Sequence, residues 1–144
     1  MGTKPASAKN NFPPLLHLSY ILQQSSDELL LGEAGVGLSQ ARIMSALHRS
    51  AARSQRSVAV ELAQTEANVS RQLRQMKRQG LVNIKPSKND ARQREVVLTA
   101  KGLSIYQKAE KLLKKQQSQF LRLLAQNEVK VFEKATHNLS KTLN

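Results

Sequence analysis

Apolar residues recur along the chain at the spacings of several helices and of one pair of strands. The first helix is predicted over residues 13–31, where leucines fall at roughly helical spacing. Pro13 and Pro14 stand at its start, where a first helical turn tolerates proline. Three glycines then end the helix and predict a plain linker, because no strand precedes them and no Lys-Ser/Thr pair follows, as a phosphate-binding loop would need. These are Gly32, Gly35 and Gly37.

Two more helices follow the linker. Ser39 is a good N-cap for a second helix over 39–50, which has Ile43 on its apolar stripe. A short third helix also begins at a serine, and we predict the turn after it at Gln64 and Thr65. The candidate caps of the third helix are Ser54 and Ser57.

A fourth helix, called here the reader helix, has both of its ends marked. Thr65 can cap its start, and Gly80 sits where a left-handed residue is wanted after its end. Steps of 100° per residue give it an apolar face and a cationic face. The apolar face holds Val69, Leu73 and Met76. The opposite face holds Ala67, Arg71, Arg74 and Arg78.

A β-hairpin is predicted after Gly80. Residues 81–85 alternate in polarity, and residues 95–99 are mostly β-branched or apolar. The segment between them has turn-forming residues and a cluster of positive charge. A cationic stripe on a helix is usually a solvated face, but a basic hairpin beside it favours a binding role. The basic residues of this predicted wing are Lys85, Lys88, Arg92 and Arg94.

Two further helices close the chain. A 3/4 apolar spacing runs over residues 100–124, and Asn127 can cap a last helix. The long apolar stripe exceeds what one small domain covers, so we expect it to pack on a second copy of the chain. The predicted fold is therefore mainly α with a small β-hairpin wing: a winged helix-turn-helix with N- and C-terminal dimerisation helices.

The domain organisation follows from these elements. We expect a single domain over residues 13–144, because 144 residues suit one core. Residues 1–12 are small and polar and predict a flexible arm. The winged-helix lobe is predicted over 53–99, and the helices over 13–50 and 100–144 include the first, fifth and sixth, which form the dimer interface.

The charge balance points to a polyanionic partner. The chain has 23 Lys and Arg against 10 Asp and Glu, a formal net charge of +13. The excess is uneven, because residues 14–50 carry two Arg against three acids and residues 51–101 carry eleven Lys or Arg against four. A uniformly basic surface, needed only for solubility, would not require this asymmetry. The cationic region coincides with the reader helix and the wing.

Composition excludes several other classes. The chain contains no cysteine, which excludes disulfides and thiolate metal sites. The first residues do not resemble a secretory signal, and no window approaches the roughly 18 apolar residues of a membrane span. We expect a cytoplasmic protein without a membrane partner.

Catalysis and metal binding lack support in the sequence. The three histidines are far apart and lack i, i+4 partners or neighbouring carboxylates. No nucleophile and base pair and no carboxylate pair stands out. We predict that the protein is not an enzyme and holds no cofactor or metal. The histidines are His17, His48 and His137.

Duplex DNA is the polyanion that the predicted elements fit. A helix of about 14 residues spans about 21 Å and fits a major groove roughly 12 Å wide. We predict that Arg71 and Arg74 face bases with Asn68 and Ser70 beside them, whereas Arg78 and the neighbouring lysine hold phosphates. The complete set of candidate DNA-binding residues is Ala67, Asn68, Ser70, Arg71, Arg74, Gln75, Arg78, Lys88, Asp90, Arg92 and Arg94.

The wing has two different tasks in this interpretation. Arg92 can enter a narrow A·T minor groove, which attracts arginine. Asp90 cannot favour DNA, and we predict that it pairs with an arginine and fixes the shape of the wing.

Taken together, these motifs resemble the MarR family of winged-helix transcriptional regulators. The most specific part is D-x-R followed by V-x-L-T-x-x-G. The resemblance covers about residues 38–103 by motif and the outer helices by arrangement. The motifs are Leu62-Ala63, Val69-Ser70-Arg71, Gly80-Leu81-Val82, Asn89-Asp90-Ala91-Arg92 and Val96-Val97-Leu98-Thr99-Ala100-Lys101-Gly102.

The resemblance implies a homodimer with interlocked first, fifth and sixth helices that binds a pseudo-palindromic operator. It also implies that Asp90 and Arg92 are the wing pair and that a small-molecule effector can release the DNA. Ile84 stands where the family often has an arginine, so one basic contact is missing. The absence of cysteine rules out the oxidation-sensing branch. Ordinary packing is the alternative to a ligand-pocket role for His17, Tyr20 and His48.

The predicted function is a sequence-specific double-stranded DNA-binding regulator, a homodimeric repressor. Two alternatives stay open at this point. One is an architectural DNA-binding protein with weak sequence preference, against which the polar residues flanking the reader arginines argue. The other is a winged-helix module that binds an acidic protein partner.

Overall fold

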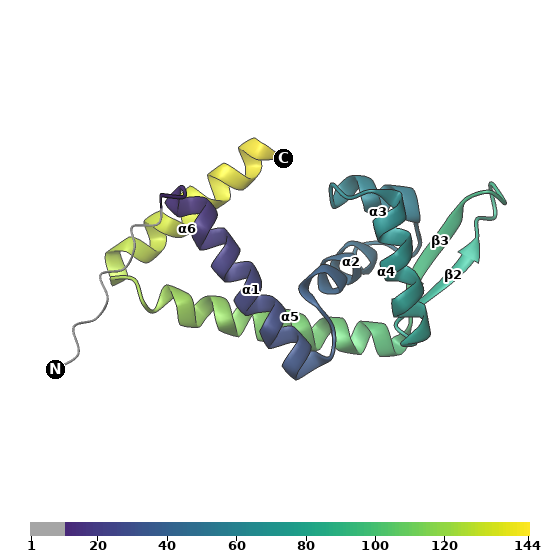
Figure 1. The fold of residues 1–144 in the computed structure, drawn as a ribbon, viewed down its shortest axis with the longest axis horizontal. Coiled ribbons are helices and arrows are strands. Elements are labelled where there is room, and N and C mark those ends of the chain that lie inside the picture. Colours follow the sequence, from purple (N-terminus) through teal and green to yellow (C-terminus); the bar gives the residue numbers. More distant parts are fainter. Residues whose placement is uncertain (1–10) are drawn as a thin grey trace.

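The computed structural model describes residues 11–144, so residues 1–10 of the predicted arm lie outside the described residues. The described chain folds into six helices and three short strands (Figure 1). In chain order these are α1 (Pro14–Ala34), α2 (Leu38–His48), β1 (Arg53–Ser54), α3 (Gln55–Glu61), α4 (Glu66–Arg78), β2 (Val82–Pro86), β3 (Arg94–Leu98), α5 (Ala100–Leu121) and α6 (Gln126–Leu143).

The molecule has a winged-helix lobe at one end and a helical extension at the other (Figure 1). α2, α3, α4 and the strands form the lobe, and α5 runs from it toward the end that holds α6 and the start of α1. The mainly helical class with a small β-hairpin, as predicted, is confirmed. Within residues 11–144 no helix is long and apolar enough to cross a membrane.

The sheet contains one strand that the sequence did not reveal. Its order is β1-β3-β2 with antiparallel pairing, and Ile84 of β2 pairs with Val96 of β3. The extra strand, Arg53–Ser54, pairs with the other edge of β3. A two-residue strand is too short to show an alternating pattern, so only its pairing partner identifies it.

The lobe is built on the apolar face predicted for the reader helix. Val69, Leu73 and Met76 of α4 are all fully buried, which confirms the prediction. They belong to the same core cluster as Ile43 of α2 and Val96 of β3. Burial of a side chain of this size stabilises the fold by roughly 1.5–3 kcal/mol, so the core determines which face of α4 points outward.

Several helix ends differ from the predictions. α1 continues through Gly32 to Ala34, and Gly35 takes the left-handed conformation with φ 69°. A single glycine inside a helix costs only about 1 kcal/mol, so Gly32 did not end it. Ser39 does not cap α2, because Gly37 holds that position and its N–H donates to Gln40 Oε1 at 3.3 Å.

The last helix likewise begins earlier than predicted. Ala125 is its N-cap, not Asn127, and the Ala125 N–H donates to a carboxylate oxygen of Glu128 at 2.9 Å. Of the two candidate caps of α3, Ser54 holds the position and Ser57 lies inside the helix, and Thr65 caps α4 as predicted; both caps accept through their hydroxyl oxygens.

A cluster of short contacts joins the end of α4 to the start of α5. Gly80 has φ 74°, and the Leu81 N–H donates to the Met76 carbonyl at 2.9 Å, which closes α4 as a left-handed C-cap motif. The Thr99 hydroxyl donates to the Gly80 carbonyl at 2.6 Å, and Thr99 Oγ1 accepts from the Gly102 N–H at 3.0 Å. One threonine therefore caps α5 and holds the end of α4.

Gly102 lets the two helices meet at this junction. A Cβ added at Gly102 would lie 2.0 Å from the Leu81 carbonyl oxygen, which is backbone and cannot rotate away. The Leu81 carbonyl also accepts from the Thr99 N–H at 3.0 Å. The glycine that ends the V-x-L-T-x-x-G motif is thus required by close backbone approach.

We predict that Gly102→Ala lowers the free energy of unfolding by at least about 1–3 kcal/mol, the typical cost of overpacking. Helix propensity alone would give the opposite sign, since alanine is favoured over glycine in a helix by about 1 kcal/mol. Gly32→Ala is the matched control, because nothing lies within 4 Å of its added Cβ, and it is expected to stabilise. Urea unfolding at one fixed protein concentration measures both, and a stabilised Gly102→Ala variant would contradict the junction as described.

Candidate nucleic-acid interface

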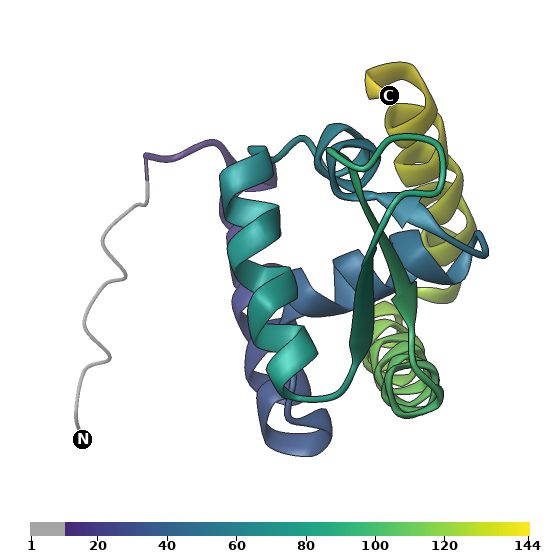
Figure 2. The ribbon, with the colours of Figure 1, turned by 90° about the vertical axis from the view of Figure 1, so that its right-hand side faces the viewer.

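The structure brings the candidate residues of the reader helix and the wing to one end of the molecule. α4 and the hairpin lie side by side there (Figures 1 and 2). Asn68 and Ser70 are half-buried at the edge of the core face. The others are exposed: Ala67, Arg71, Arg74, Gln75, Arg78, Lys88, Asp90, Arg92 and Arg94.

The positive charge of this end is not neutralised within the chain. Among the described residues, the acidic partners in ion pairs are Glu61 and Glu110, and neither pairs with a cation of α4 or of the wing. Glu66 lies in the first turn of α4, where an acid complements the helix dipole. The arginines of α4 are therefore free to bind an external anion.

A hollow lies at the start of α4. It is open to solvent and has a volume of about 570 Å³. Side chains from the α3–α4 turn and from the first two turns of α4 surround it. Ala63 holds this turn in the left-handed conformation, with φ 51°. The hollow is lined by Ala63, Gln64, Thr65, Ala67, Asn68 and Arg71.

Arg71 is held from within its own helix. Its Nη2 donates to Asn68 Oδ1 at 2.7 Å, and Asn68 Nδ2 donates to Gln64 Oε1 at 2.9 Å. Arg71 and Asn68, which were predicted as neighbouring base contacts, thus form one hydrogen-bonded unit. The sequence did not reveal that Gln64 holds Asn68, since no periodic pattern marks a residue in the turn between two helices.

The wing is shaped by Asp90, but not as predicted. Asp90 Oδ1 accepts from the Arg92 backbone N–H at 2.9 Å, and the Asp90 carbonyl accepts from the Gln93 N–H at 3.0 Å. No ion pair joins Asp90 to an arginine side chain within the described residues, so that prediction is wrong. A two-residue separation suits a turn in which the carboxylate accepts from the backbone, and this leaves the Arg92 guanidinium unpaired.

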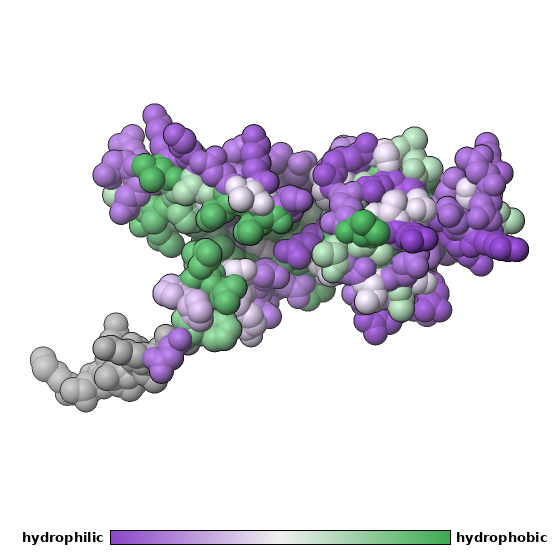
Figure 3. Space-filling model, turned by 90° about the horizontal axis from the view of Figure 1, so that it is seen from above, coloured by the Kyte–Doolittle hydropathy of each residue, from purple (hydrophilic) through white to green (hydrophobic). Residues whose placement is uncertain are grey.

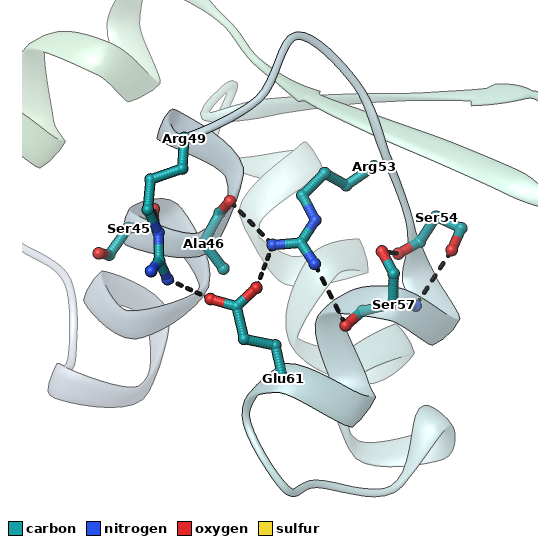
Figure 4. Close-up of polar contacts among 7 residues, drawn as sticks. All are labelled: Ser45, Ala46, Arg49, Arg53, Ser54, Ser57 and Glu61. Atoms are coloured by element: carbon teal, nitrogen blue, oxygen red, sulfur yellow. Dashed lines mark hydrogen bonds and ion pairs between the residues drawn. The ribbon is translucent and has the colours of Figure 1, made fainter. Parts of the chain in front are cut away.

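An ion-pair cluster joins α2 and β1 to the end of α3 (Figure 4). Glu61 accepts from the guanidinium groups of both Arg49 and Arg53. Arg53 also donates to the Ala46 and Ser57 carbonyls, at 3.3 and 3.4 Å. The side chain of Arg53 is 19% exposed and that of Arg49 is 64% exposed, so Arg53 is the stronger tie. No pattern in the sequence predicts this cluster, because its members come from three elements.

The fold and the charge distribution together define a winged-helix protein with an unneutralised cationic helix and wing. Residues 34–93, most of the lobe, match the MarR family model. This match and the MarR-like structures described next show that the lobe is similar to that of the MarR family and that the chain has the MarR fold. A search of curated proteins gave no significant match.

Solved structures of MarR-type proteins share the fold over nearly the whole chain. A crystal structure of MarR has a TM-score of 0.83 at 20% identity and covers 95% of each chain. PcaV, a transcriptional regulator from Streptomyces coelicolor, has a TM-score of 0.73 at 21% identity and covers 91% of this chain and 98% of its own. A MarR cysteine-to-serine mutant from E. coli, solved in complex with operator DNA, has a TM-score of 0.73 at 23% identity and covers 91% and 94%.

The clamp on Glu61 predicts a pH dependence of stability. The hydrogen bond from Arg53, with the positive charges of both arginines, holds the pKa of Glu61 below its usual 4.5, and partial burial opposes this. A carboxyl with a lowered folded-state pKa stabilises the fold above its unfolded-state pKa, and that stabilisation is lost as the pH falls through the folded-state pKa. Glu61→Gln should therefore be less stable than the wild type at pH 7, and the difference should shrink below about pH 4.5.

Unfolding by urea between pH 3 and pH 7, at one protein concentration, measures this difference. Glu110→Gln is the matched control, because Glu110 pairs only with the exposed Lys114 on its own helix at 3.2 Å, and such pairs contribute little. If the Glu61→Gln difference is the same at every pH, the clamp does not act through the charge of Glu61.

Proposed function

We propose that the protein is a homodimeric, sequence-specific repressor that binds a pseudo-palindromic duplex DNA operator through α4 and the wing. The observation that supports this most directly is the set of exposed arginines on α4 that no acidic residue of the described chain neutralises. α4 has the length for a major groove, and a basic hairpin stands beside it. The MarR mutant from E. coli, which has the same fold, was solved in complex with operator DNA, and this supports duplex DNA as the partner.

The roles proposed for the individual residues follow their places on α4. Arg71, which lines the hollow, and Arg74 lie nearer to its start than Arg78 does, and they are assigned to base edges. Arg78 lies in the last turn with Lys77 and is assigned to phosphates. On the wing, Arg92 is assigned to the adjacent minor groove, and its backbone position is held by Asp90.

The proposed homodimer is supported by the exposed apolar surface of α1 and α6. No residue of α6 is buried in the single chain, whereas most of the stability of a helix in a protein comes from the packing of its apolar face. Figure 3 shows apolar residues gathered at the end of the molecule that holds α6 and the start of α1. The large exposed apolar residues there include Leu15, Leu16, Tyr20, Ile21, Val131, Phe132, Leu139 and Leu143.

A second copy that covers this surface would set the distance between two reader helices. Half-sites on DNA must then lie about one helical turn, roughly 34–36 Å, or a multiple of it apart. Dimerisation and operator symmetry are thus one proposal, because two-fold related readers need a two-fold related site.

A small-molecule effector would act on this spacing. A half-open cavity of about 270 Å³ lies between α1 and α5, with Glu33, Lys115 and Gln116 among its lining residues. Neither described cavity is lined by His17, Tyr20 or His48. The ring of His48 instead packs on Tyr106, with ring centroids 4.8 Å apart. A screen in which no small molecule changes the affinity for operator DNA would leave a constitutive regulator.

For DNA recognition, we predict that selection from a random duplex library returns a palindromic motif. Arg71→Ala and Arg74→Ala should each lose preference at defined base pairs, by roughly 1–3 kcal/mol per bidentate contact. Lys77→Ala should weaken operator and random duplex alike and reduce the salt slope by about 0.9, as expected for one lost phosphate contact. A selection without any motif would favour an architectural protein, and no duplex affinity at moderate salt would favour an acidic protein partner.

For the dimer, we predict that Leu139→Glu shifts the protein toward a monomer in sedimentation at micromolar concentration. A charge in a buried interface is costly unless it is paired. Val60→Glu is the matched control: Val60 is also exposed, at 74%, but lies on α3 of the lobe. Equal sedimentation of both variants and the wild type as dimers would exclude α6 from the interface, and a monomeric wild type would contradict the dimer.

A further inference from the structure

A chain of side-chain hydrogen bonds continues from Arg71 beyond its helix. Gln72 Nε2 donates to Gln64 Oε1 at 3.1 Å, so Gln64 accepts from both Asn68 and Gln72. The Ser39 hydroxyl then donates to Gln72 Oε1 at 2.7 Å. The chain therefore runs from Arg71 on α4, through the α3–α4 turn, back to α4 and on to α2.

The guanidinium group of Arg71, at one end, fixes which group donates and which accepts in every hydrogen bond of the series. A guanidinium group only donates, so Asn68 must turn its oxygen toward Arg71 and its amide nitrogen toward Gln64. Gln64 must then present its oxygen to both Asn68 and Gln72. Gln72 in turn has its oxygen left for Ser39. A flip of any one of these three amides would place two donors or two acceptors face to face, so each amide has a single favourable orientation.

Ser39, at the far end of this series of hydrogen bonds, lies in a part of α2 that is itself held in place. The Leu38 N–H donates to Asp27 Oδ1 of α1 at 2.7 Å. Gln40, which is 8% exposed, donates to Oε1 of Gln79, the C-cap of α4, at 3.3 Å. Ser39 stands between these two contacts. The orientation of Arg71 is thus connected to the start of α2, outside the helix-turn-helix.

We propose that Gln72 and Ser39 are positioning residues that set the base preference of Arg71 through this chain. Neither residue is assigned to a DNA contact. The hydrogen bond to Asn68 uses one N–H of Arg71 Nη2 and orients the guanidinium group. The remaining N–H groups of this planar fork can still bind a guanine edge through two hydrogen bonds. A fork held in one orientation loses less entropy on binding the correct base, which increases discrimination.

This inference rests on the proposed function, because it needs Arg71 to read a base. The test therefore begins by locating that base: selection with Arg71→Ala identifies the position whose preference depends on Arg71. The expected loss there is roughly fivefold to 150-fold, the discrimination of one bidentate contact. Competition binding with duplexes that differ only at this position then measures each variant.

Gln72→Met removes both hydrogen bonds of Gln72 at nearly constant size, and Ser39→Ala cuts the chain at its far end. Each is expected to lower the preference at the Arg71 position by at least about threefold, within the range found for directly coupled residues. Ser45→Ala, which removes a hydroxyl from the same helix but outside the chain, is the matched control and should leave the preference unchanged. Melting temperatures establish that each variant is folded.

The double variants distinguish positioning from a general structural effect. With Arg71→Ala already present, Gln72→Met should cause no further change in preference, and Ser39→Ala combined with Gln72→Met should have no larger effect than the stronger single change. If Arg71→Ala loses its preference while Gln72→Met and Ser39→Ala retain that of the wild type, the positioning chain is refuted and the proposed function stands. If Arg71→Ala retains every preference, base reading by Arg71 is refuted and the positioning chain with it.

Discussion

The close approach of the Leu81 carbonyl to Gly102 is the constraint on which the rest of the structure depends. There the end of α4 meets the start of α5, and an added Cβ would lie 2.0 Å from the carbonyl oxygen. Thr99 holds both helices, and Lys101 donates to the Gln79 carbonyl at 2.8 Å. The helix proposed to read DNA is thereby tied to the helix proposed to carry the dimer interface, so a shift of α5 must also move α4.

Apolar and polar contacts hold α4 in different ways. The buried face around Leu73 decides which side of the helix points outward, because apolar burial is strong but not directional. The directional contacts then set finer details. The ion pairs of Glu61 fix α3 against α2, and the hydrogen bonds from Ser39 to Arg71 turn individual side chains. A cationic surface presented by a rigid helix can discriminate between bases as well as bind phosphates.

The acidic residues of the lobe leave the cations of α4 and of the wing unpaired. The acid of the lobe that forms ion pairs, Glu61, binds arginines that lie away from α4, and Asp90 accepts from the backbone of the wing rather than from a guanidinium group. The cations of α4 and the wing are consequently left for a partner. Most of the apolar residues of α6 are left exposed in the same way, so the single chain presents a cationic surface for the proposed DNA partner and an apolar surface for the proposed second copy.

The sequence by itself determined the order of the helices, the buried face of α4, the caps at Thr65 and Gly80, and the hairpin, because each depends on residues that are neighbours along the chain. Two predictions based on adjacent residues were wrong: Gly32 does not end α1, and Asp90 accepts from the backbone of the wing instead of pairing with an arginine side chain. Only the tertiary structure decided the strand Arg53–Ser54, the Glu61 clamp and the chain from Ser39 to Arg71. These contacts join residues from different elements, and their geometry arises only when the core has brought those elements together.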